Sequence, residues 1–242
     1  MVENPVVTAL ADRVRRDGSA PLLTWYRPQS DGRTELSVRT FANWVDKTAN
    51  LLDDLGVEGR VAGPVSLAHP GHWMSLVWPL ATWQHGCCYL ADQPDAASEL
   101  VVVGPEDPRA QPGMVTLACS LHPLGLGLGD LPDGVLDFSR EALAQPDAHL
   151  SVSGRPTTPV WIDAARSLSL DALDPTTGSS AVADRAGPER VLVRPTTAWQ
   201  TLVDAVLGPI LGGGSAVVVD GPVDADALAR LVAAERVTGG MA

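Results

Sequence analysis

The chain alternates between segments whose apolar residues recur every three or four positions and short runs that are apolar throughout. The first pattern is typical of helices with one buried face, and the second of strands. A helix is predicted after Asn4, because asparagine caps helices well and Pro5 suits the first helical position. The clearest helix ends at Gly56, and its apolar stripe consists of Phe41, Trp44, Val45, Leu52 and Leu55.

Predicted strands and helices then follow one another along most of the chain. This alternation predicts an α/β fold, with parallel and mixed sheets and helices on both faces. The first main stretch is predicted to contain a strand, a helix and two strands, at 60–69, 71–86, 87–92 and 99–105. The second is predicted to be a strand–helix–strand–helix unit, at 189–195, 196–214, 215–221 and 224–237. Between these two stretches we expect a short helix at 139–145 and a strand at 147–154.

A stretch rich in proline and glycine separates the two alternating units. Residues 104–134 are predicted to form a long irregular connection. We therefore expect two subdomains, the first at 1–134 and the second, a truncated βαβα unit, at 135–242. The pattern GLGLG at 125–129 lacks the spacing of a dinucleotide-binding loop, so a plain loop is expected there.

The charge balance removes two classes of partner. The 242 residues include 29 acidic and 17 basic side chains, a net charge of −12. A nucleic-acid binder needs a basic surface, and an anionic membrane attracts basic rather than acidic segments, so neither partner is expected. The chain shows neither a signal-peptide pattern nor an apolar run of membrane-spanning length. We expect a cytoplasmic protein whose three cysteines stay reduced.

The candidate chemistry is sparse. His69 and His72 stand close together in the sequence, but no third ligand is near, so capping or solvent contact is expected and no metal site. The serines stand in no GxSxG pattern, so no hydrolase nucleophile is indicated. The sequence predicts no catalytic residue.

Two stretches resemble the N-terminal domain of the adenylate-forming superfamily, which includes acyl-CoA synthetases, luciferases and peptide-synthetase adenylation domains. The first runs from ELSVRTF to CCYLAD (35–92), and the second from ERVLVRP to AAERVT (189–238). The chain also resembles short stand-alone proteins of high-GC bacteria. This resemblance implies the superfamily's N-terminal fold, without the segments that follow it in a complete enzyme.

The superfamily holds the phosphates of ATP with a loop of the form TSGTTGxPK. Counting back from Glu189 places this loop at VSGRPTTPV (152–160), where the resemblance implies a degenerate version. Pro156 removes a donor amide, and Val160 stands where the superfamily has its lysine. The alternative position at 176–178 leaves too few residues before Glu189. The degenerate phosphate-loop positions are Ser153, Gly154, Arg155, Thr157, Thr158, Pro159 and Val160.

These losses predict a non-catalytic remnant of an adenylate-forming enzyme, acting as a binding, regulatory or scaffold protein. Two alternatives stay open. One is a subunit of a split acyl-adenylate-forming ligase, with a partner chain that supplies the missing half. The other is a small-molecule binder that keeps an acyl or nucleotide pocket without chemistry. No cofactor is expected. ATP or AMP with Mg²⁺ would be expected only if one of the alternatives holds.

The sequence also bears on assembly. The predicted helix at 199–211 is apolar around most of its circumference, so it must be buried on more than one side. A second copy of the chain is the simplest cover, and we expect a homodimer formed through the C-terminal subdomain.

Overall fold

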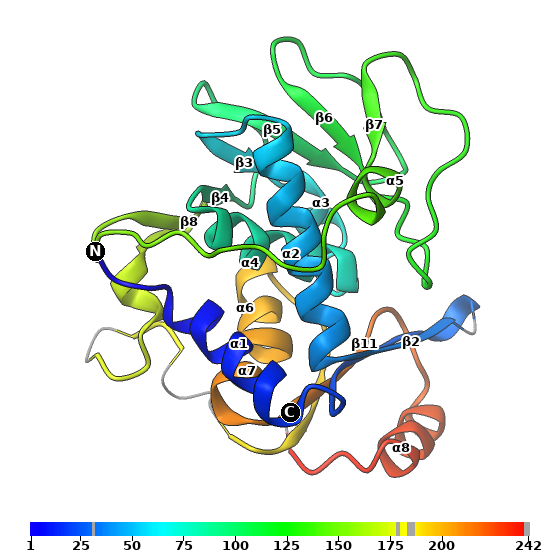
Figure 1. Ribbon diagram of the computed structural model, residues 1–242. Helices are drawn as coiled ribbons and strands as arrows, with labels where there is room; N and C mark the ends of the chain where they lie inside the picture. The colour runs from blue at the N-terminus through cyan, green and yellow to red at the C-terminus, as the bar shows by residue number, and fades with distance from the viewer. Residues whose placement is uncertain (31, 178–179, 183–186, 240–242) are drawn as a thin grey trace.

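The computed structural model describes residues 1–30, 32–177, 180–182 and 187–239. The chain forms two β-sheets, and several helices lie between them in the middle of the molecule (Figure 1). The larger sheet has the order β7-β6-β5-β3-β4-β8-β9, and all its neighbours run parallel except β8 and β9. Its strands are β3 (Arg60–Ala62), β4 (Cys88–Leu90), β5 (Ser98–Val103), β6 (Val115–Ala118), β7 (Val135–Asp137), β8 (Pro159–Asp163) and β9 (Arg166–Ser169).

The smaller sheet joins the two ends of the chain. Its order is β10-β11-β1-β2, with β1 parallel to β11 and antiparallel to β2. The expected α/β fold with parallel and mixed sheets is therefore confirmed. The strands of this sheet are β1 (Pro21–Arg27), β2 (Gly32–Ser37), β10 (Arg190–Val193) and β11 (Ser215–Val219).

The helix start expected at Asn4 is confirmed, and Ser37 caps a second helix. Asn4 accepts from the amides of Val6 and Val7, and Ser37 accepts from that of Thr40. The α-helices are α1 (Pro5–Asp17), α2 (Val38–Asp54), α3 (Pro64–Ala68), α4 (Trp73–His85), α5 (Phe138–Leu143), α6 (Ala198–Leu202), α7 (Gly208–Gly212) and α8 (Ala225–Ala234). The π-helical turn η4 (Val203–Leu207) joins α6 to α7, and η1 (Pro28–Ser30) and η2 (Leu170–Leu173) are 3₁₀ turns.

Helix α4 lies at the centre of the molecule. Every residue from Trp73 to Gln84 is buried, because α1, α2, α3 and β4 all pack against this helix. Three tryptophans place their indole rings in the core, and each indole N–H finds an acceptor outside the helix. Trp73 donates to the carbonyl oxygen of Pro123 at 3.1 Å, Trp78 to the sulfur of Cys119 at 3.3 Å and Trp83 to the carbonyl oxygen of Val160 at 2.6 Å.

The two sheets are not built from consecutive halves of the chain. Strands β7, β8 and β9 follow residue 134 in the sequence, yet they join the sheet that contains β3 to β6. Strands β1 and β2, near the N-terminus, pair beside β11. The Pro- and Gly-rich connection at 104–134 is therefore not a division between sheets, and it contains the strand β6.

Two of the expected strands differ in the structure. The strand expected at 60–69 ends at Ala62, and α3 begins at Pro64. Gly63 stands at this change of direction because an added Cβ would lie 1.7 Å from the hydroxyl oxygen of Tyr89. The segment expected as a strand at 147–154 instead runs along α2, where Asn50 donates to the carbonyl oxygens of Pro146 and Ala148 (Figure 1).

The apolar helix at 199–211 is buried within a single chain. It is formed by α6, η4 and α7, which pack on β11, β10 and β1, while α1 covers α7. The buried guanidinium of Arg13, on α1, donates to the carbonyl oxygens of Pro209 and Gly214 at 2.9 and 2.8 Å. This helix therefore needs no second copy as its cover, and the homodimer itself stays a prediction.

Within the parts of the chain that the structure describes, every helix is too short or too polar to cross a membrane.

The buried imidazole of His72 makes the stability of the fold depend on pH. His72 is 1% exposed, and its Nδ1 accepts the amide N–H of Met74 at 3.2 Å. Burial, with the neighbouring His69 and Arg27, lowers the pKa of His72 from 6.5 to about 3. The unfolded chain therefore binds a proton that the folded chain does not, and stability falls as the pH falls from 6.5 towards 3.

We expect His72 to contribute a loss of about 1.4 kcal/mol per pH unit within this window. Urea unfolding at a series of pH values measures the loss. The matched control is His72→Asn, which keeps a capping oxygen and does not titrate, so its stability curve should be flatter. Equal slopes for the two proteins would show that His72 does not titrate in this way.

Candidate functional site

The degenerate phosphate-loop residues lie where the chain enters β8. The segment before them passes over α2, with the ammonium group of Lys47 2.8 Å from the carboxylate of Asp147. Gly154 then pairs with Val2, each amide donating to the other's carbonyl oxygen at 2.8 and 2.9 Å. The N-terminus therefore holds this segment against the sheet.

The tight turn at 155–158 uses its own amides. The amide N–H of Arg155 donates to the hydroxyl of Thr158 at 2.9 Å, and the amide of Thr158 donates back to the carbonyl oxygen of Arg155 at 2.9 Å. Pro156 has no N–H to offer. The amide of Gly154, just before the turn, is also taken, so the amides of Gly154, Arg155 and Thr158 are not available to an anion.

Val160 lies inside the core and not at a binding surface. Its side chain is 4% exposed, and its carbonyl oxygen accepts the indole N–H of Trp83. Arg155, Thr157 and Pro159 are exposed, whereas Ser153 and Thr158 are half-buried. The structure thus brings these residues to one turn but gives the position of the superfamily's lysine to an apolar core residue.

In the turn after β8, a carboxylate accepts hydrogen bonds from the backbone amides. Oδ1 of Asp163 accepts the amides of Ala165 and Arg166 at 2.8 and 2.9 Å. Its Oδ2 accepts the indole N–H of Trp161 at 2.8 Å and lies 3.3 Å from Nε of Arg166. The carboxylate occupies the position in which an external anion would meet these amides. Sequence reasoning missed Asp163, although DAAR between two short apolar runs was the available signal.

The alternative loop position begins at a self-contained turn. The amide and hydroxyl of Thr176 both donate to Oδ1 of Asp174, at 2.8 and 2.7 Å. These bonds lower the pKa of Asp174. Residue 178, which completes that alternative, lies outside the described residues.

The two histidines do not form a joint site. His72 caps α4, as expected, while Nε2 of His69 lies 2.8 Å from the carboxylate of Glu106. No group of three or more His, Cys, Asp or Glu side chains suited to a metal ion occurs among the described residues.

The GLGLG segment also has a structural explanation. Gly125 has a φ of +69°, and an added Cβ there would lie 3.0 Å from the indole of Trp44. The segment therefore packs on the tryptophans of α2 and α4, which is the plain-loop expectation.

Comparison with known proteins agrees with this fold. No family model matches the chain. A protein of Mycobacterium tuberculosis, described as a TIGR03089 family protein, is 28% identical over 240 residues, which cover 93% of each chain.

Several solved structures have a fold similar to that of this chain over nearly its whole length. An acyl-CoA synthetase of Brucella canis matches with a TM-score of 0.71 and 17% identity, over 96% of this chain and 46% of that one. The apo structure of MatB from Rhodopseudomonas palustris matches with a TM-score of 0.69 and 20% sequence identity, over 98% of this chain and 48% of that one. The ATP-bound structure of MatB matches with a TM-score of 0.68 and 19% sequence identity.

The chain therefore has the fold of the N-terminal domain of acyl-CoA synthetases. The sequence resemblance to the adenylate-forming superfamily is confirmed at the level of the fold. The chain covers about half the length of the solved synthetases, 46% and 48% of the two chains.

The closed turn after β8 predicts a measurable contribution from Asp163. Replacing Asp163 by alanine leaves two amides and an indole N–H without their charged acceptor. We expect Asp163→Ala to lower the free energy of unfolding by about 1.5–3 kcal/mol, the range for hydrogen bonds to charged groups. The control is Asp163→Asn, whose side-chain oxygen still accepts the two amides and which should lose less. Equal losses in chemical denaturation would contradict this account.

Proposed function

We propose that this chain is a non-catalytic, cytoplasmic binding protein, with a regulatory or scaffold role, that keeps the N-terminal fold of acyl-CoA synthetases. The observation that carries the proposal is the closed state of both turns that adjoin β8. One turn uses its own threonine and the other its own aspartate to bind the amides. With Val160 in the core, the lysine charge is also missing from this position.

These features weigh against ATP chemistry for a physical reason. A phosphate group needs several free N–H donors or positive charges that converge on it. Opening the turn at 155–158 would break its internal hydrogen bonds and would still leave Pro156 without a donor. Arg155 is the one exposed cation of that turn, and a single surface arginine does not replace a loop of amides.

The first prediction of this proposal concerns catalysis. The purified chain should show no ATP–pyrophosphate exchange with any carboxylic acid, because the phosphate grip is closed. A radioactive exchange assay over a panel of short, long and dicarboxylic acids measures this, with a complete acyl-CoA synthetase as the positive control. Exchange above the protein-free background by the chain alone would overturn the proposal.

The same purified protein can be used to test the alternative of a small-molecule binder without chemistry. A thermal-shift screen with ATP, AMP, acyl-adenylates and CoA detects any of these ligands. A ligand present at about 100 times its dissociation constant stabilises the folded state by about 2.7 kcal/mol. Stabilisation without exchange would identify a binder that has lost its chemistry.

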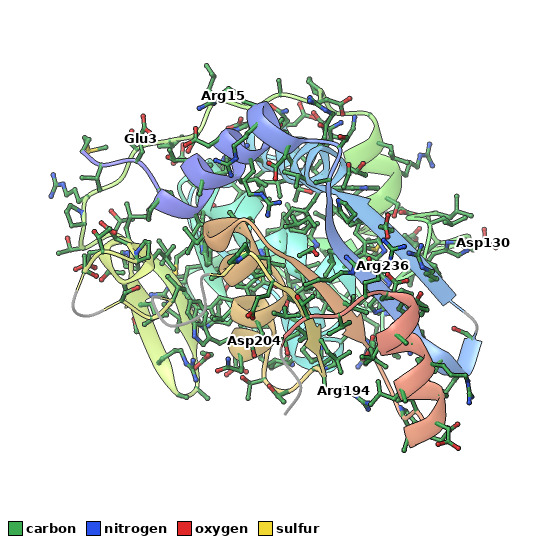
Figure 2. All side chains as sticks on the ribbon, turned by 90° about the horizontal axis from the view of Figure 1, so that it is seen from below. Glu3, Arg15, Asp130, Arg194, Asp204 and Arg236 are labelled. Carbon is green, nitrogen blue, oxygen red and sulfur yellow. The ribbon has the colours of Figure 1, made fainter. Side chains whose placement is uncertain are left out.

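The split-ligase alternative is favoured by one surface. Helix α8 lies at the margin of the molecule, away from α1 (Figure 2). Its apolar residues Leu228, Leu231 and Val232 are only half-buried. Exchange activity that appears only when a second, complementary chain is added would support this alternative.

The homodimer remains a proposal, with α8 in place of the helix at 199–211. Self-association through the half-buried face of α8 would cover it and would double the mass of 25.3 kDa. Light scattering at micromolar concentration measures the mass. The variant Leu228→Asp should shift the protein towards the monomer, and a wild-type mass near 25.3 kDa would rule the homodimer out.

A further inference from the structure

A groove lies at the C-terminal end of α4, where this helix meets the end of α2. It has a volume of about 370 Å³, and its lining includes two acidic residues, Asp53 and Glu58. A smaller chamber of about 40 Å³ adjoins it and shares Gly86, Cys87 and Val152 with it. The segment at 152–158 forms the outer wall of the chamber.

The electrostatic character of the groove is negative. Neither lysine nor arginine is among its described lining residues. Helix α4 ends at Gly86, so the partial negative charge of its C-terminus faces the groove. Glu99 adds a third carboxylate nearby, since it accepts the amides of Glu58 and Gly59 at 2.7 and 2.9 Å. Burial, together with these carboxylates, raises the pKa of Cys87 to about 12, so its thiol stays protonated.

The carboxylate of Asp53 is held in place. Its Oδ1 lies 3.1 Å from Nε2 of His85, and its Oδ2 lies 3.0 Å from Nε2 of His149. Both imidazoles are largely buried, and burial lowers the pKa of His85, which therefore stays neutral near pH 7. The two contacts with His85 and His149 fix the position of the Asp53 carboxylate at the groove.

A buried donor without a partner lines the adjoining chamber. Asn4 is 2% exposed, and its Oδ1 accepts the amides of Val6 and Val7 at 3.0 and 3.3 Å. This capping role fixes the orientation of the amide, so Nδ2 is turned away from the helix. Nδ2 has no hydrogen-bond partner, and a buried donor in that state is costly. The other walls are mostly apolar and include Trp83, Val160 and Leu170.

We propose that the groove and chamber bind a small primary amine whose short apolar chain ends in a carbonyl or hydroxyl group. The ammonium group lies between Asp53 and Glu58, at the negative end of α4. The chain passes Cys87 into the chamber, and the terminal oxygen accepts the N–H of Asn4 Nδ2. The chamber shares Gly154 and Thr158 with the loop before β8. The proposed contacts use the side chains of Asp53, Glu58 and Asn4 and no amide of that loop, so the proposal can be tested independently of nucleotide binding.

Three related compounds test the two halves of the site. The probes are 4-aminobutanamide, which has both groups, butylamine, which lacks the oxygen, and pentanamide, which lacks the charge. Calorimetric titration of the full chain should give the tightest binding for 4-aminobutanamide. Asp53→Asn and Glu58→Gln should each weaken its binding by about tenfold, the size expected for losing a charged hydrogen bond.

The variant Asn4→Ser isolates the chamber, because serine keeps the helix cap and removes the amide donor. It should weaken the binding of 4-aminobutanamide and leave that of butylamine unchanged. Glu3→Gln, an exposed acid that does not line the groove, is the control and should change neither affinity.

Four outcomes would overturn the proposal. They are equal binding of pentanamide and 4-aminobutanamide, unchanged affinity in both acid variants, an Asn4→Ser variant that binds 4-aminobutanamide as tightly as the wild type, and a crystal soaked with 4-aminobutanamide in which Asn4 contacts an ordered water only. If Asp53→Asn does not fold, Glu58→Gln alone decides the charge requirement.

Discussion

The rest of the structure depends on the complete burial of helix α4. A helix with apolar residues on every side is stable only when other elements cover it all round, and α1, α2, α3 and β4 do so here. The three indole N–H groups of this helix would be costly to bury without acceptors. Their acceptors lie on three different segments, at Pro123, Cys119 and Val160, so the same helix sets the position of each.

This packing bears directly on function. The bond from Trp83 to the carbonyl oxygen of Val160 holds the start of β8 against α4 and keeps the Val160 side chain in the core. A strand fixed in this way leaves little freedom to the turns on either side of it. In each turn two amides donate to an acceptor of the same turn, those of Arg155 and Thr158 before β8 and those of Ala165 and Arg166 after it. The fold of an acyl-CoA synthetase N-terminal domain is thus combined here with two turns that bind several of their own amides.

The candidate binding surfaces lie elsewhere, and their charge follows the composition. The net charge of −12 is carried in part by Asp53, Glu58 and Glu99 around one groove, which favours a cationic ligand there. Glu235, which follows α8, accepts the hydroxyl of Tyr26 and pairs with Arg33 and Arg190. The apolar residues of α8 itself are only half-buried.

The sequence alone determined the α/β class, the helix start at Asn4 and the long amphipathic helix that ends near Gly56, because periodicity and caps are local. It did not reveal which strands share a sheet, since β1 pairs with β11 across almost the whole chain. Nor did it show that α1 covers the helix at 199–211, or that Asp163 closes its turn. Asp53, His85, His149 and Asn4 meet only in the folded chain, because residues far apart in sequence become neighbours through packing, which no local pattern records.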